Sequence, residues 1–390
     1  MRPALHSLAV QGTSQNATQT ASADVQAAQV RGLGAGVDLA KCLLAPYGVM
    51  AMQQHSQEIW LALDSRGAGG IESHVLQLAK ALQDSGRAVR ILLLADHGRH
   101  PLHAQAAALG ITLECLDGSP LGLWRALRQR RPCLFHSHGY KAGILGRTLA
   151  LLLGVPVVST FHAGEPGRGR LRLYQWLDEF SGRLAPRLAV SAAIGARLGT
   201  GTQVLDNFVS LAPERLHAPL SLAFVGRLSH EKGPDRFLAI ARQHPQLPCL
   251  VFGDGPLREQ LQAQASSNVQ FMGMVDDMPQ RWASIGLLCM PSRHEGLPMA
   301  ALEAMAHGVP VAALDVGGLG QLATPQAGGL LCASGDVAAL SAAIGAWGQL
   351  SNAQRRQRGQ AARQWVARRF TPEAVLPEIL RCYAQAGGGA

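Results

Sequence analysis

Two glutamates with a regular spacing stand in a stretch that is otherwise almost free of charge. In HEGLPMAALEAMAHGVPVAA, residues 294–313, Glu295 and Glu303 lie eight positions apart. The preceding IGLLCMPS is typical of a buried strand that ends in a turn, and Pro298 suits the start of a helix. A helix start offers free N–H groups to phosphate, while a nearby carboxylate can accept two vicinal sugar hydroxyls. The stretch therefore predicts a site for a sugar diphosphate, and the alternative is a pair of solvated glutamates.

A basic pair follows another expected strand. In FVGRLSHEKGPDRF, Arg227 comes just after the apolar run and Lys232 follows five positions later. Arginine can hold a phosphate through two parallel N–H bonds, and lysine adds a compact positive charge. Lysine is a rare choice in this chain, since only four of the 35 basic residues are lysines. The pair therefore indicates an anion site, against the alternative of a solvated basic loop.

A glycine loop and two histidines also lie where expected strands end. SRGAGGIE places Gly69 and Gly70 between a strand and a helix, and glycines allow the backbone to approach an anion closely. An ordinary tight turn would explain this loop equally well. His162 follows VVSTF, and His138 ends CLFHSH. Taken alone, a histidine at a strand end is expected to have a local structural partner.

Alternating strands and helices must position these residues. From residue 58 onward, apolar runs such as IWLALD alternate with amphipathic segments such as SHVLQLAKALQDSG, which is the pattern of parallel sheets with crossover helices. A second series follows a linker near residues 207–219. The pattern predicts an α/β fold with two Rossmann-like domains, in which ligands bind beyond the carboxyl ends of strands. The final helix should follow FTPEAV, with Thr371 as its cap, Pro372 in its first turn and Glu373 complementing the helix dipole.

Composition limits the class of protein. With 47% hydrophobic and 16% charged residues the chain is globular, and its run TLALLLGVPVV is too short to span a bilayer. The seven cysteines are scattered without a CxxC pair, which favours a reducing cytoplasm. A formal net charge of +9 favours acidic partners, but no aromatic platform or motif supports nucleic acid. Residues 1–56 lack any sustained period and are expected to form a disordered extension.

The ordered series of motifs resembles the retaining glycosyltransferases of family 4, the glycosyl transferases group 1, which have the GT-B fold. PSRHEGLPMAALEAMAHGVPVAALDVGG resembles the signature of that family, and the two glutamates match its E-x7-E spacing. GGIE, GRLSHEKG and GDGP resemble its glycine loop, its diphosphate-binding pair and its next strand end. The similarity covers nearly the whole chain after residue 57. It implies two facing Rossmann-like domains with a central cleft and a C-terminal helix that crosses back.

The resemblance implies where a donor binds. Arg227 and Lys232 would neutralise the donor diphosphate, and Glu303 would accept hydrogen bonds from the ribose hydroxyls. The donor would be a nucleotide-sugar, linked to UDP or GDP, and the reaction would need no cofactor and no metal site. Backbone groups would complete the donor-binding set: Gly69, Gly70, Gly296 and Leu297.

The same resemblance implies a catalytic pair and a domain layout. Glu295 would contact the transferred sugar, and His162 would face that sugar from the other domain. His138 would lie on the acceptor side. The expected boundaries separate an acceptor domain, a donor domain, and a crossing helix with its tail: 57–212, 213–372 and 373–390.

Two departures from the family pattern lie beside the expected site. GGLGQL has Gln321 where the family often has an acidic residue, and DNFVSL lacks the Gly and Asp of the interdomain turn. Neither position handles charge in the expected reaction. We therefore predict altered domain closure or donor preference rather than loss of activity.

The acceptor is less well specified by the sequence. LWRALRQRRP and GRGRLRLYQW, residues 123–132 and 167–176, interleave arginine with large apolar side chains, which suits an anionic membrane surface. A solvated helix face and a loop would explain them equally well. We expect a saccharide or lipid-linked acceptor, in bacterial cell-surface polysaccharide or lipopolysaccharide synthesis. The expected location is the cytoplasm, with peripheral contact at the inner face of the plasma membrane.

Two alternatives share the expected fold. A nucleotide-sugar epimerase would use the same donor site without an acceptor. A non-catalytic GT-B partner subunit would tolerate the loss of Glu303 and His162. The order of the family motifs favours the transferase over both.

Overall fold

The computed structural model describes residues 56–67, 69–98, 100–162, 169–213 and 218–387. The predicted disordered extension, residues 1–56, lies outside the described residues except for its last position. Two parallel sheets organise the rest, as the alternating pattern predicted.

The first sheet has the strand order β3-β2-β1-β4-β5-β6-β7, and neighbouring strands run parallel. Its sequence order reverses between β1 and β4, which are neighbours in space but not in the chain. The strands are β1 (Ser56–Leu63), β2 (Ala88–Leu93), β3 (Thr112–Cys115), β4 (Pro132–His138), β5 (Val157–Phe161), β6 (Arg187–Ala189) and β7 (Thr202–Val204).

The second sheet has the order β10-β9-β8-β11-β12-β13, again with parallel neighbours, and it reverses between β8 and β11. Both orders are those of doubly wound, Rossmann-like sheets. The strands are β8 (Leu222–Val225), β9 (Cys249–Phe252), β10 (Val269–Gly273), β11 (Leu287–Met290), β12 (Val311–Leu314) and β13 (Leu330–Cys332).

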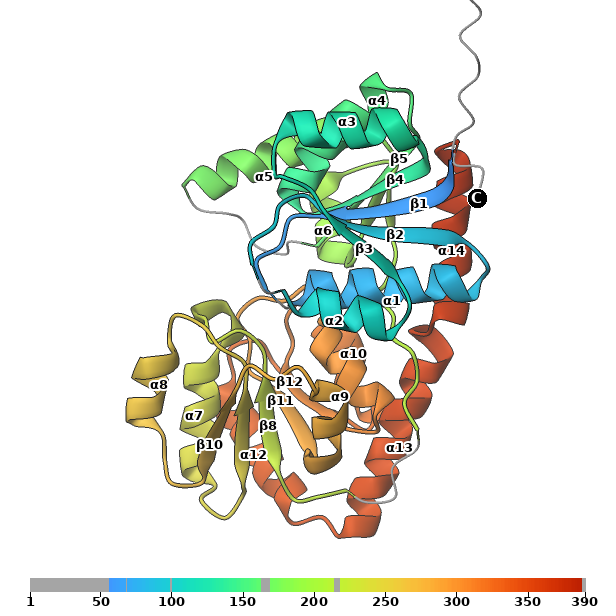
Figure 1. Cartoon of the computed structure of the whole chain (residues 1–390). Helices are drawn as coiled ribbons and strands as arrows, with labels where there is room; N and C mark the ends of the chain where they lie inside the picture. Colours follow the sequence, from blue (N-terminus) through green and yellow to red (C-terminus); the bar gives the residue numbers. More distant parts are fainter. Residues whose placement is uncertain (1–55, 68, 99, 163–168, 214–217, 388–390) are drawn as a thin grey trace, which may run out of the picture. The chain divides into compact units, whose positions relative to one another are not determined.

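Helices cover both faces of the first sheet (Figure 1). In β1, Ile59 and Leu61 pack toward α1 and α14, whereas Trp60 and Ala62 pack toward α3 and α4. Burial on both faces explains why this strand is continuously apolar rather than alternating. The elements are α1 (Gly70–Asp84), α2 (Pro101–Ala108), α3 (Pro120–Arg130), the π-helical turn η1 (Ala142–Gly146), α4 (Arg147–Leu152), α5 (Arg170–Ser181), η2 (Gly182–Leu184) and α6 (Ala192–Leu198).

The second sheet is covered in the same way. In β11, Leu288 and Met290 pack with α10 and α13, while Leu287 and Cys289 pack with α7 and α12. The elements are η3 (His230–Lys232), α7 (Pro234–Gln243), α8 (Arg258–Gln264), α9 (Met278–Arg281), η4 (Trp282–Ser284), α10 (Met299–Ala306), α11 (Leu319–Leu322), η5 (Pro325–Ala327), α12 (Val337–Gly348) and α13 (Asn352–Arg369).

The helix α14 (Pro372–Gln385) follows the second sheet in sequence but packs on the first (Figure 1). Its buried residues join the core formed by α1 and the β1 face: Val375, Leu376, Ile379, Cys382 and Tyr383. Pro372 and Glu373 stand in its first turn as predicted. Thr371 is the N-cap residue, but its buried side chain makes no cap bond, and only its backbone carbonyl accepts, from the N–H groups of Ala374 and Val375. We retain 57–212, 213–372 and 373–390 as proposed domain boundaries, although β1 begins one residue before the first range and α14 one residue before the last.

A hydrogen bond from α14 to the first sheet provides a test of this packing. The Tyr383 hydroxyl lies 2.7 Å from Nδ1 of His136, and both side chains are fully buried. Tyr383→Phe should leave that histidine nitrogen without a partner and lower the free energy of unfolding by about 1–3 kcal/mol. The measurement is the urea midpoint, with exposed Tyr174→Phe as the matched control. Equal midpoints for the two variants would contradict the prediction.

Candidate active site

The reversal of strand order in each sheet decides which loops meet. Because β8 and β11 are adjacent and parallel, the loops after their carboxyl ends, residues 226–233 and 291–298, emerge side by side. The same holds for the loops after β1 and β4 in the first sheet. These are the positions where doubly wound sheets bind ligands. The glycine loop, the basic pair and Glu295 lie there, whereas His162 follows β5 and Glu303 lies within α10.

Lys232 and Glu295 form an ion pair across the two loops of the second sheet. The Lys232 Nζ lies 2.7 Å from Glu295 Oε2, and the Ser292 hydroxyl donates to Oε1 at 2.9 Å. The Glu295 side chain is only 3% exposed, whereas that of Lys232 is 32% exposed. A buried carboxylate without partners would be costly, so these two donors account for its burial. The lysine also presents charge outward from the same position.

Arg227 lies beside this pair but makes no ion pair with any described residue. It follows Gly226 at the end of β8 and is exposed. Burial disfavours the ionised form of Glu231, yet the Ser229 hydrogen bond and the charges of Arg227 and Lys232 outweigh it and lower the pKa of that carboxyl. The loop after β8 therefore carries an exposed guanidinium that interacts with Glu231 only through space.

Glu303 lies within α10 and points to α1 of the first sheet's domain. The Ser73 hydroxyl donates to its Oε1. Burial raises the pKa of the Glu303 carboxyl, and the Ser73 hydrogen bond acts in the opposite direction. The glycine loop leads directly to this contact, because Gly69 is the extended N-cap of α1 and Gly70 its first residue. Both glycines are exposed.

The backbone at Gly296 and Leu297 is held by its carbonyl groups. The Gly296 carbonyl accepts from Gly318 N at 2.6 Å, and the Leu297 carbonyl accepts from the Asn207 side chain, also at 2.6 Å. Within the described part of the chain, the N–H groups of these two residues have no acceptor. That they bind an anion stays a prediction of the helix-start pattern.

His162 and His138 meet beyond the ends of their strands. His138 Nδ1 lies 3.0 Å from His162 Nε2, and the ring of His74 from α1 lies 4.9 Å from the His162 ring. Burial lowers the pKa of all three imidazoles, that of His74 to about 4, so the rings are neutral at pH 7. A Cβ added to Gly296 would lie 3.6 Å from the His162 carbonyl oxygen. The loop that carries Glu295 therefore packs directly beside His162.

Several contacts at this site were not singled out by sequence reasoning. Ser73 and His74 follow the GGIE motif at once, so position alone could have flagged them. Ser292 lies three residues before Glu295, within the signature. Asn207 was noted only as part of an unusual turn, and its bond to Leu297 shows that the DNFVSL segment supports the site.

Two models of glycosyltransferase families match the sequence of this chain. Residues 68–204 match the family model described as Glycosyltransferase Family 4, and residues 219–348 match Glycosyl transferases group 1. The two matches together span more than half of the chain. The chain belongs to the family 4, group 1 glycosyltransferases. This glycosyltransferase is therefore an enzyme, and its two domains follow the order in which the family places them.

Relatives of this glycosyltransferase have similar lengths. It is 28% identical to a glycogen synthase of Mycobacterium tuberculosis over 82% of this chain and 92% of that protein. It is also 28% identical to a phosphatidyl-myo-inositol mannosyltransferase of Mycobacterium leprae, over 81% and 92%.

Solved structures of other GT-B enzymes share the fold. Anabaena Alr3699/HepE in complex with UDP-glucose aligns with a TM-score of 0.73 at 21% identity, over 85% of this chain and all of that one. The lipopolysaccharide outer core galactosyltransferase WaaB aligns with a TM-score of 0.62 at 17% identity, over 85% and 99%. These identities are low, so the likeness establishes the GT-B fold of this glycosyltransferase.

A glycine turn behind Glu295 provides a test of the site's rigidity. Gly317 has φ +58°, and an added Cβ would lie 2.1 Å from the Glu295 carbonyl oxygen. Gly317→Ala should lower the free energy of unfolding by about 3 kcal/mol or more, because left-handed strain adds to displacement of that backbone. Gly335→Ala is the matched control, with φ +84° and open space, and should cost only about 1–2 kcal/mol. Urea unfolding of both variants decides the matter; equal costs would show that Gly317 does not support the loop.

Proposed function

We propose that this glycosyltransferase moves a sugar from a UDP- or GDP-sugar to a saccharide or lipid-linked acceptor, with retention at the anomeric carbon. The observation that carries the proposal is the Lys232–Glu295 pair at 2.7 Å, beside the unpaired N–H groups of Gly296 and Leu297. At this strand end a cation and two N–H groups suit the negative charge of a diphosphate, and a carboxylate suits the hydroxyls of its sugar. Donor complexes of fold neighbours, such as the one with UDP-glucose, support the assignment.

The donor would lie along the second sheet's loops. Lys232 and exposed Arg227 would stabilise the charge that develops on the leaving diphosphate. Glu303 would accept hydrogen bonds from the ribose hydroxyls, which would take over part of the donor role that the Ser73 hydroxyl has in the structure. Gly69 and Gly70, exposed at the start of α1, would allow close approach from the other domain.

The reacting centre would lie between Glu295 and His162. Glu295 would accept a hydrogen bond from the sugar, and neutral His162 would donate one, oriented by its contact with His138. The bond from the anomeric carbon to the diphosphate breaks, and a bond to the acceptor oxygen forms on the same face. The acceptor's proton passes to the departing diphosphate. The anomeric carbon therefore keeps its configuration, and no nucleophile from the protein is required.

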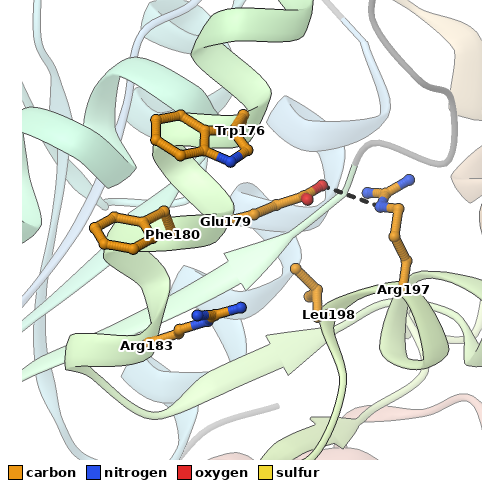
Figure 2. A pocket seen from close by; sticks show the side chains of 6 residues that line it. All are labelled: Trp176, Glu179, Phe180, Arg183, Arg197 and Leu198. Atoms are coloured by element: carbon orange, nitrogen blue, oxygen red, sulfur yellow. Dashed lines mark ion pairs between the residues drawn. The ribbon is translucent and has the colours of Figure 1, made fainter.

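The acceptor side carries an exposed apolar surface that suits a membrane. On α5 and the following turn, large side chains are more than half exposed: Leu173, Tyr174, Trp176, Phe180 and Leu184. Trp176 and Phe180 stack with ring centroids 5.5 Å apart, and the Arg183 guanidinium lies 5.9 Å from the Phe180 ring centroid (Figure 2). Glu179 pairs with Arg197 at 3.0 Å, so the acidic group beside these rings is neutralised. Aromatic side chains next to arginine favour the interface of an anionic bilayer.

This surface supports a peripheral role in cell-surface polysaccharide or lipopolysaccharide synthesis. Among the helices that the structure describes, none has both the length and the apolar character to cross a bilayer. The described cysteines are free thiols, which agrees with the proposed cytoplasmic location: Cys115, Cys133, Cys249, Cys289, Cys332 and Cys382. We propose attachment at the inner face of the plasma membrane, with α5 in contact with lipid.

The donor proposal is tested by release of nucleoside diphosphate from a panel of UDP-, GDP- and ADP-sugars. One donor should be turned over, and Lys232→Ala and Glu303→Ala should each weaken donor binding ten- to a hundredfold, as expected for losing a charge-assisted contact of about 1.5–3 kcal/mol. Lys80→Ala is the control, because Lys80 pairs only with Asp84 on the surface of α1.

The outcome also separates the alternative functions. Donor conversion that needs no acceptor would indicate an epimerase. A failure of every donor to bind, shown by the absence of any thermal shift, would favour the partner-subunit function. With a working donor and acceptor, NMR of the product should show the anomeric configuration of the donor, and inversion would refute the retaining mechanism.

The membrane proposal is tested by vesicle flotation. The wild-type protein should float with vesicles containing anionic phospholipid and remain below with neutral ones, since each basic side chain near the surface adds about 1 kcal/mol. A Trp176→Ser, Phe180→Ser double variant should lose most of this binding. Met274→Ser is the control, because Met274 is as exposed as Trp176, at 57%, but lies in the other domain. Flotation that does not depend on lipid charge, or on these two rings, would contradict the proposal.

A further inference from the structure

Three histidines from separate elements converge beside the proposed reacting centre. His74 comes from α1, His138 ends β4 and His162 follows β5. One ring nitrogen of each lies within 4.8 Å of those of the other two. No other group of three metal-ligating side chains comes this close among the residues that the structure describes.

Two nitrogens of this cluster lack partners. Nδ1 of His74 and Nε2 of His138 are buried without a hydrogen bond, and the two residues are only 4% and 1% exposed. An unpartnered polar atom in the interior normally costs free energy, and native structures seldom keep two in one place. The Asn207 side chain lies against His74 and acts on its imidazole, whereas Nε2 of His138 has no hydrogen-bond partner among the described residues, so its lone pair remains available to a ligand.

We propose that His74, His138 and His162 form a binding site for a divalent transition-metal ion, with Zn²⁺ as the ion that fits best. Neutral imidazole is a preferred ligand of zinc, copper and nickel, and three histidines with one open position make a common zinc geometry. Zinc–nitrogen bonds of about 2.0–2.1 Å place tetrahedral ligands roughly 3.4 Å apart. His138 Nδ1 and His162 Nε2 are already 3.0 Å apart and all three histidines offer a nitrogen within 4.8 Å, so shifts of about 1 Å would bring the rings to this spacing.

The surroundings hold the cluster in place. The ring of His136 lies 4.2 Å from that of His138, and His136 is itself fixed by Tyr383 at 2.7 Å and by the Thr160 hydroxyl at 2.7 Å. Outer residues that fix the orientation of ligands contribute strongly to metal affinity. His162 is partly exposed, so the open position of the ion would face the proposed sugar site.

The consequence for catalysis rests on the proposed function. An ion bound to His162 would remove the imidazole that we assign to the transferred sugar. Zn²⁺ should therefore inhibit transfer, and a chelator should restore it. Metal binding itself does not depend on that assignment, because it is measured without donor or acceptor.

The test is a titration of the full-length protein, after treatment with a chelator, with Co²⁺ alone. The readout is the visible absorption of the bound Co²⁺. One equivalent should bind with the spectrum of an imidazole-ligated, four-coordinate ion, and Zn²⁺ should displace it. His74→Gln and His162→Gln should each weaken Co²⁺ binding at least tenfold, since even outer-shell changes typically cost 10–100-fold. His162 is the less buried of the two, so its substitution is the less disruptive to folding.

His103→Gln is the matched control, because His103 lies 3.6 Å from Cys115 Sγ and forms the competing surface pair of soft ligands. This variant should keep the full spectrum. Absence of the spectrum in the wild-type protein, or its loss in His103→Gln with retention in His162→Gln, would overturn the proposal. If donor turnover is normal and Co²⁺ does not bind, the metal site is wrong and the transferase function stands.

Discussion

The buried carboxylate of Glu295 is the constraint on which the site depends. A carboxylate that is 3% exposed needs donors, and it has two, from Lys232 and Ser292. Those donors come from loops that only meet because β8 and β11 are neighbours. The burial of Glu295 thus depends on the strand order of the second sheet, on the glycine turn that packs behind its carbonyl and on the position of the lysine. A substitution that removed the Glu295 carboxylate would leave Lys232 without the partner that fixes the position of its side chain.

A second set of contacts joins the two sheets' domains around this pair. Ser73 bonds to Glu303, Asn207 bonds to the carbonyl of Leu297, and Gly296 packs near the His162 carbonyl. The linker is tied to the C-terminal helices as well, since Val209 N donates to the Phe370 carbonyl at 2.9 Å. Gln321, one of the two departures from the family pattern, bonds to Asp206 in the linker and to Arg369 of α13. The effect of this departure on domain closure or donor preference stays a prediction, and these contacts place Gln321 between the linker and α13.

The fold was accessible from the sequence because its signal is local. Apolar runs of four to eight residues, glycine turns and an amphipathic helix each depend on neighbours in the chain, and β1, α1, β8 and β11 lie where those signals predicted them. Strand ends then indicated which polar residues reach a ligand. Pairings between distant segments carry no such signal. Ser73 and Glu303 are 230 positions apart, and His136 and Tyr383 are 247 apart, so their contacts follow from packing that no periodicity encodes. At Thr371 a local signal was wrong, because the residue type favours a side-chain cap but the side chain is buried and makes no cap bond.

The bond from Tyr383 to His136 has a consequence for how the protein is made. The first sheet is synthesised first, yet residues from α14 complete one face of its core and supply the partner of His136 Nδ1. A ribosome that has produced only the first domain has therefore produced a domain with an open apolar face and with one imidazole nitrogen, His136 Nδ1, that still lacks its partner. Domains usually fold in order as they emerge. Here the N-terminal half must wait, partly folded, until the donor half has formed and residue 383 has left the exit tunnel.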